Sequence, residues 1–222
     1  MCIRDSEHVD PSTVGNGTRF LVSDMAGRST LALKAEALGI DIDGKVLGDI
    51  TETLKRLEYE GYHFEAADAS LELLMRSAAG WEQDFFRLES FRVNLDHRSG
   101  SGSRAWTDKA VDVETEATVK LWVGDERIVA TGEGNGPVNA LDAALRFGLR
   151  RHYGDALASI SLTDYKVRVL DTGEGTGAVT RVLLESTNGQ KSWSTMGVSE
   201  NIIEASWQAL ADSVVFALLH QP

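Results

Sequence analysis

The sequence predicts an α+β protein in which a small helical connector precedes a pseudo-symmetric, duplicated βββα domain. Apolar residues recur at helical spacing before residue 80 and alternate with polar residues after it. A hairpin, a turn and an amphipathic helix then occur twice in the same order. We therefore expect a non-native or truncated start at 1–6, helical connecting subdomains at 7–79 and the duplicated domain at 80–220.

The connector is expected to hold three short helices joined by polar turns. The second places Ile50 and Leu54 on one face and stops at Gly61. The third carries Leu71 and Met75 in its apolar stripe. The predicted helices cover residues 29–38, 46–61 and 66–79.

The first copy of the repeat starts with an alternating strand, followed by a Gly/Ser-rich surface loop. A hairpin around Gly124 follows, and then a glycine-rich turn leads into a helix. Pro137 suits the first helical position, where no backbone donor is needed. The predicted segments are a strand at 85–95, hairpin strands at 114–123 and 127–131, and a turn at 132–137.

The second copy follows the same order at a constant separation. Gly124 and Gly189 lie 65 positions apart, and the same separation relates Gly132 to Gly197. The first strands match at a separation of 74, because the first copy has the longer Gly/Ser loop. The separation of 65 also relates Ile128 to Trp193, Ala140 to Ala205 and Leu145 to Leu210. The sequence therefore contains an internal duplication, with repeats at about 85–153 and 160–220.

Composition and charge exclude several classes of function. A net charge of −12 argues against nucleic acid as a partner, because phosphate binding needs clustered Lys and Arg. No apolar run approaches the ~20 residues of a membrane span, so no membrane partner is expected. The single Cys2 cannot form an internal disulfide, which is typical of a cytoplasmic protein. No metal site, cofactor motif or nucleophile–base pair is found, and the five histidines include no closely spaced pair.

The turns that open the two helices differ. The first has Gly132, Gly134 and Gly136, so its backbone could approach a small ligand such as an amino acid. These glycines could equally serve only to make a tight strand-to-helix turn. The second turn has one glycine, Gly197, and Ser199 is expected to cap its helix.

Several segments resemble the isopropylmalate and citramalate synthases. GNGPVNALDAAL (134–145), LTDYKVRVL (162–170) and GVSENIIEASWQAL (197–210) resemble their allosteric domain, the last two being most similar to bacterial citramalate synthases. Residues 7–11, 14–16 and 38–41 resemble the connecting subdomains, and residues 58–70 resemble the linker. The resemblance covers nearly all of the chain after residue 6.

This family condenses acetyl-CoA with a 2-oxo acid, pyruvate in citramalate synthase, in a metal-dependent reaction. The resemblance implies that the divalent metal belongs to a (β/α)₈ barrel, which would need about 250 residues and is absent from this sequence. It implies a homodimeric regulatory fragment of a citramalate synthase. The alternatives are the equivalent fragment of an isopropylmalate synthase and a stand-alone amino-acid-binding module.

The resemblance also implies two sets of site residues. An effector, isoleucine or alternatively leucine, is expected between the repeats, where Asp164 could pair with its ammonium group or could be an ordinary surface residue. His8, Asp10 and Asn16 would complete the acetyl-CoA site of the partner subunit, or alternatively His8 and Asp10 cap a turn. The expected effector residues are Gly134, Asn135, Gly136, Val138 and Asn139, with Asp164, Tyr165, Val167, Ala178 and Thr180 opposite them.

Overall fold

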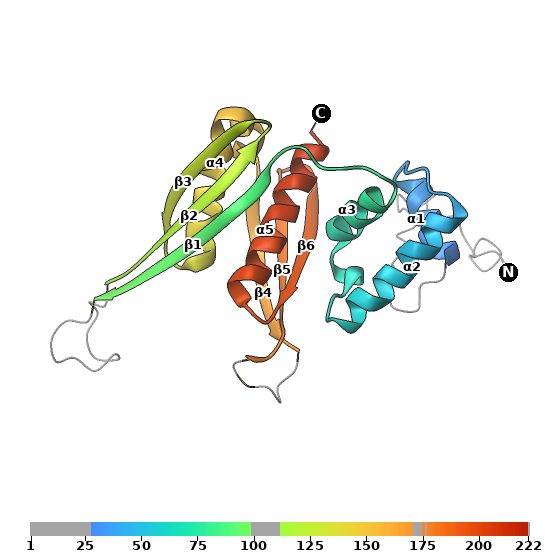
Figure 1. Cartoon of the computed structure of the whole chain (residues 1–222), viewed down its shortest axis with the longest axis horizontal. Helices are drawn as coiled ribbons and strands as arrows, with labels where there is room; N and C mark the ends of the chain where they lie inside the picture. The colour runs from blue at the N-terminus through green and yellow to red at the C-terminus, as the bar shows by residue number, and fades with distance from the viewer. Residues whose placement is uncertain (1–27, 99–111, 171–174, 176, 222) are drawn as a thin grey trace.

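The computed structural model describes residues 28–98, 112–170, 175 and 177–221, and it confirms the α+β fold with two βββα units (Figure 1). The connector lies on the side of the second unit. It consists of α1 (Arg28–Ala37), α2 (Gly44–Tyr59), the 3₁₀ helix η3 (Phe64–Ala66) and α3 (Asp68–Ala78). Unit 1 consists of β1 (Arg87–Arg98), β2 (Asp112–Val123), β3 (Glu126–Gly134) and α4 (Pro137–Ala158). Unit 2 consists of β4 (Ser161–Val169), β5 (Thr180–Thr187), β6 (Ser192–Ser199) and α5 (Ile202–Leu219).

Each unit forms a three-stranded antiparallel sheet covered on one face by its helix. Sheet A has the order β1-β2-β3 and sheet B the order β4-β5-β6. Helix α4 packs on β2 and β3, α5 packs on β5 and β6, and the two helices contact each other. Helix α5 is long and apolar enough to cross a membrane by composition, but more than half of it is buried, as expected of a core helix.

The strand register confirms the duplication residue by residue. Leu121 pairs with Ile128 in sheet A, and Ser186 pairs with Trp193 in sheet B, 65 positions later. Both first strands also have a register shift, between Leu88 and Ser90 in β1 and between Leu162 and Asp164 in β4. These two irregularities are 74 positions apart, the separation that relates the first strands in the sequence.

Two predicted boundaries are wrong. The glycine-rich segment predicted to be a turn from residue 132 continues β3 as far as Gly134, which pairs with Thr115. Ser199 is not the N-cap of α5, because it still pairs with Thr180 as the last residue of β6. Asn201 caps the helix instead, and its side chain accepts a hydrogen bond from Ile203 N at 2.9 Å.

Glycines allow each helix to lie close to the last strand of its sheet. A Cβ atom on Gly132 would overlap the backbone of Ala144, and one on Gly197 would overlap the backbone carbonyl of Ala205. Because Gly132 and Gly197 are related by the repeat, both units use the same close approach between helix and strand. The duplication therefore preserves the helix-to-sheet distance as well as the register.

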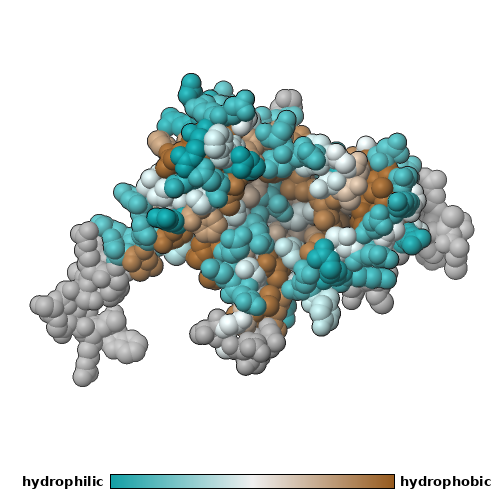
Figure 2. Space-filling view, in the orientation of Figure 1, coloured by the Kyte–Doolittle hydropathy of each residue, from teal (hydrophilic) through white to brown (hydrophobic). Residues whose placement is uncertain are grey.

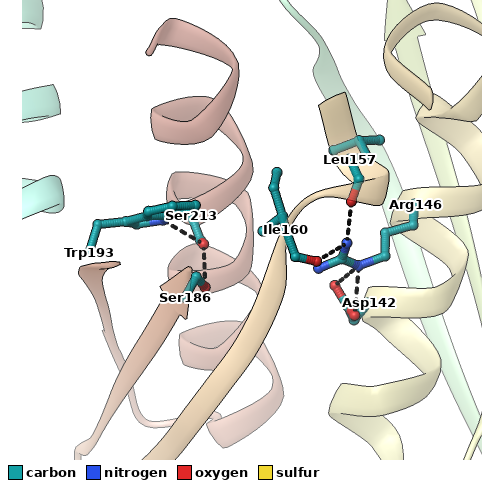
Figure 3. Close-up of polar contacts among 7 residues, drawn as sticks. All are labelled: Asp142, Arg146, Leu157, Ile160, Ser186, Trp193 and Ser213. Carbon is teal, nitrogen blue, oxygen red and sulfur yellow. Dashed lines mark hydrogen bonds and ion pairs between the residues drawn. The ribbon is translucent and has the colours of Figure 1, made fainter. Parts of the chain in front are cut away.

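The interiors of the two units differ in chemistry. In unit 2, Ser213 lies between two buried partners: its Oγ accepts from Trp193 Nε1 at 3.0 Å and contacts Ser186 Oγ at 2.8 Å (Figure 3). In unit 1, Arg146 pairs with Asp142 and donates to two carbonyl oxygens, one in the last turn of α4 and one just after it (Figure 3). These carbonyl groups belong to Leu157 and Ile160, each at 3.0 Å from Nη1.

Helix α3 joins the connector to the repeats through two faces. Ala69 and Leu73 belong to the main core formed by both units. Leu71 and Met75 belong to a second core, shared with α1 and α2. The start of α3 also covers the open edge of sheet B: Ser194 N donates to an Asp68 side chain, and Met196 N donates to Ser70 Oγ, at 3.1 and 3.0 Å.

Candidate functional site

The start of α4 offers backbone donors that its counterpart in unit 2 does not. Gly136 is the N-cap of α4 and provides no capping side chain. Asn201, its counterpart 65 positions later, caps Ile203 N in α5. The residue equivalent to Ile203 is Val138, whose N–H therefore has no such acceptor from the N-cap. Free N–H groups and the helix dipole at this end favour an anion such as a carboxylate.

The other residues of this turn have defined structural roles. Asn139 Oδ1 accepts from Asn135 N at 3.1 Å and so fixes the turn. A Cβ atom on Gly134 would lie 2.5 Å from Ala140 N, so this glycine is required for packing against α4. Space around Gly136 is open within 4 Å. Of the two expected ligand glycines, only Gly136 is unexplained by packing.

Apolar side chains extend beyond the helices on the inner faces of the first strands. Val167 pairs with buried Val182 and therefore faces the core, yet it is 40% exposed. In unit 1, Leu95 pairs with buried Thr115 and is 54% exposed. Figure 2 shows apolar surface at the lower ends of both units. These ends form a half-covered apolar surface suited to an aliphatic side chain.

Tyr165 lies on the same inner face of β4, since it pairs with buried Leu184. Its Oη lies 2.9 Å from Ser206 Oγ of α5. Ring contact between the units occurs at the equivalent position of β1, where Phe91 stacks on Trp207 with ring centroids 5.4 Å apart. Tyr165 and Val138 both pack against the main core.

A buried hydroxyl lies next to the glycine turn. Thr115 is the cross-strand partner of Gly134 and is 2% exposed. Its Oγ1 has no hydrogen-bond partner among the residues that the structure describes. Its counterpart Thr180 is also buried and donates to the carbonyl oxygen of buried Ala178 at 3.5 Å. An unsatisfied buried hydroxyl is uncommon and calls for an explanation such as a ligand or a water.

Asp164 does not join this group. It alternates with Tyr165 and so lies on the opposite face of β4. Its carboxylate pairs with Lys166, and the hydrogen bond from Lys166 lowers the pKa of Asp164. Its expected role as the partner of an ammonium group stays a prediction.

The second expected set, His8, Asp10 and Asn16, lies outside the described residues. Within the described ranges, no three His, Cys, Asp or Glu side chains converge in a way that could hold a metal ion. The residues present there do not fit a metal centre.

A family model for the LeuA allosteric (dimerisation) domain matches residues 65–218. The chain belongs to this family. The match starts within η3, so the LeuA domain by this measure includes α3 together with both units.

The curated proteins most similar to this LeuA domain include several that are named (R)-citramalate synthase. The protein from Streptomyces coelicolor is 50% identical over 216 residues, which are 96% of this chain and 38% of the relative. Those from Synechocystis sp. and Aquifex aeolicus are 47% and 46% identical, again over 96% of this chain. The chain spans less than two fifths of the length of these relatives.

Three residues of the LeuA domain on the inner faces of unit 1 were not predicted: Thr115, Leu95, and Val93, which pairs with buried Ala117. The repeat could have predicted Thr115, because a separation of 65 relates it to Thr180, which was predicted. A separation of 74 likewise relates Val93 to the expected Val167. The predicted effector residues take the helix start from the first copy and the strands from the second, and they leave out the equivalent strand positions of the first copy.

Proposed function

We propose that this chain is the regulatory and dimerisation region of a citramalate synthase, an acyltransferase acting in isoleucine biosynthesis, and that it binds isoleucine as a feedback inhibitor. The condensation of acetyl-CoA with pyruvate, and the divalent metal that serves it, would belong to the catalytic part of the cytoplasmic, homodimeric enzyme. His8, Asp10 and Asn16 would complete the acetyl-CoA site of the partner subunit.

The difference between Gly136 and Asn201 carries the proposal. Where α5 supplies its own capping oxygen, α4 leaves room for the carboxylate of a ligand at the N–H groups of Val138 and Asn139. The aliphatic side chain of the amino acid would lie against the half-covered surface of Val167 and its counterpart Val93. The hydroxyl groups of Thr115 and Thr180 lie on the inner faces of the neighbouring strands, β2 and β5.

The relation between the units supports a site that uses both of them. Phe91 of unit 1 reaches Trp207 of unit 2. The counterpart of Phe91 is Tyr165, whose Oη lies 2.9 Å from Ser206 Oγ near the start of α5. The ring of Tyr165 would then lie beside the aliphatic side chain of the ligand.

Calorimetry with the full chain tests the proposal through Gly136→Asn. The new side chain copies the cap of α5, and we expect it to occupy the donors and abolish isoleucine binding. Asn201→Gly is the matched control, because it removes the equivalent cap from α5 and should leave binding unchanged. Equal binding by the wild type and Gly136→Asn would contradict the site.

The identity of the effector is tested separately by thermal unfolding. A ligand that binds only the folded state raises the melting temperature in proportion to its affinity. We expect isoleucine at millimolar concentration to raise it more than leucine or valine. A larger shift with leucine would identify an isopropylmalate-synthase type of regulation, and no shift with any of the three would refute amino-acid sensing.

A further inference from the structure

The outer strands β3 and β6 occupy equivalent edges of the two sheets, but only one edge is covered. On β6, the outward N–H groups of Ser194 and Met196 donate to side chains of α3. The matching register makes Val129 and Thr131 the equivalent outward donors of β3. Among the described residues, no hydrogen bond satisfies these two donors. Figure 1 shows α3 beside β6 and no element beyond β3.

The helices repeat this difference. Ser70 of α3 donates to Asp212 Oδ2 of α5 at 2.7 Å, in addition to accepting from the edge of β6. The residue of α4 equivalent to Asp212 is Phe147, which is 63% exposed. The surface that α3 covers on unit 2 is therefore bare on unit 1. We call Val129, Thr131 and Phe147 the bare edge.

An uncovered edge strand is a template for pairing with another strand. Natural proteins usually protect such an edge with a charge or a proline in its centre. The centre of β3 reads Val129, Ala130 and Thr131 and has neither, and Val129 is 53% exposed. The bare edge therefore combines free backbone donors with apolar side chains on both sides of the strand.

We propose that the bare edge is the surface through which two copies of this chain associate. The β3 strands pair antiparallel across a two-fold axis, and the two α4 helices lie side by side with the Phe147 side chains between them. The α4 helix of each copy then covers unit 1 of the other copy, in the way that α3 covers unit 2 within one chain. The same surface on both copies is self-complementary under two-fold symmetry, which closes the assembly at a dimer. This inference rests on the dimerisation included in the proposed function.

Sedimentation of the full chain tests the surface through Val129→Lys and Phe147→Lys. Both side chains are exposed, so neither change disturbs the core. Each variant brings like charges together at the axis, and we expect each to weaken the dimer at least about tenfold. The controls are Tyr59→Lys on α2, which is 93% exposed, and Leu95→Lys at the opposite edge of sheet A. Both controls should leave the dimer unchanged.

The possible outcomes separate this inference from the proposed function. A wild-type chain that stays monomeric at millimolar concentration refutes dimerisation and the surface together. A dimer that survives both Lys variants, or that Leu95→Lys disrupts instead, refutes only the surface. Hydrogen exchange gives a second measurement that needs no variant: the amides of Val129 and Thr131 should exchange more slowly as dimer forms. Unchanged exchange of both amides in the dimer would also refute the pairing.

Discussion

Units 1 and 2 have the same register and the same helix contacts but different interiors at equivalent positions. Leu121, Ile128 and Gly148 of unit 1 correspond to Ser186, Trp193 and Ser213 of unit 2. In unit 1, Gly148 packs closely against Leu121 and Ile128, since a Cβ atom at this position would lie 3.2 Å from Leu121 Cδ1. In unit 2 the larger Trp193 donates a hydrogen bond to Ser213, which is hydrogen-bonded in turn to Ser186.

This difference shows which features the fold requires. The backbone tolerates at these positions either an apolar set or a polar set whose members are hydrogen-bonded to one another. It retains the glycines that let each helix approach its strand, Gly132 and Gly197. The common fold is therefore set by register and close approach, and the interior chemistry is free to diverge.

The largest expected loss of stability tests the close approach of helix to strand that both units share. Gly197→Ala and Gly132→Ala should each destabilise the chain by about 3 kcal/mol or more, because the new methyl group overlaps helix backbone that cannot move alone. Urea unfolding measures the change. Gly44→Ala is the control, since open space surrounds Gly44 at the start of α2. A loss below about 1 kcal/mol at both positions would contradict the close-approach argument.

The next largest effect is a pH dependence of stability that arises from Asp212, the residue of unit 2 equivalent to Phe147. Burial raises the pKa of Asp212 to about 6, and the hydrogen bond from Ser70 only partly opposes this. Because the folded-state pKa lies above that of the unfolded chain, this group lowers stability as the pH rises from about 4 to about 6. Asp212→Asn should remove this pH dependence. Between about pH 4 and pH 6, the free energy of unfolding of the variant should therefore rise by roughly 2–3 kcal/mol relative to that of the wild type.

Unfolding free energies of the wild type and Asp212→Asn, measured from below pH 4 to pH 8, test the sign. The two curves should diverge through this window and then run parallel. Curves that stay parallel throughout would mean that Asp212 titrates normally. Asp155→Asn serves as a control, because Asp155 is exposed.

Ser213→Ala tests the polar interior of unit 2. It leaves the indole N–H of Trp193 and the hydroxyl of Ser186 without their buried partner. Orphaned buried polar groups lower stability by about 2 kcal/mol. Denaturant unfolding measures the loss, and Ser159→Ala at an exposed helix end is the comparison. Equal stability of the two variants would show that the network is replaceable by water.

The smallest effect is at the helix starts. Asn201→Gly should lower stability by a few tenths of a kcal/mol through loss of the cap on Ile203, and Gly136→Asn should raise it by a similar amount. Thermal unfolding without ligand measures both. A destabilising Gly136→Asn would show that the turn in unit 1 cannot accept the geometry of its counterpart.

Much of the candidate site was predictable because it depends on local pattern. The repeat and the helix start at Pro137 follow from spacing along the chain. The packing role of Gly134 did not follow, because it depends on how closely α4 approaches β3. The outward position of Asp164 did not follow either, because it depends on which face of β4 is turned toward the core. The prediction of Ser199 as a cap is wrong because β6 continues four residues beyond the strand predicted at 192–195, so that Ser199 still pairs with Thr180.

The duplicated βββα architecture of this LeuA domain and the register of its hairpins follow from the amino-acid sequence alone. Period-two alternation and tight turns specify these features within short stretches of chain. The covering of β6 by α3, which leaves β3 bare, is evident only from the folded structure. This arrangement depends on contacts between residues more than 120 positions apart, such as Ser70 with Met196 and Asp212. Such contacts cannot be predicted from the pattern of neighbouring residues.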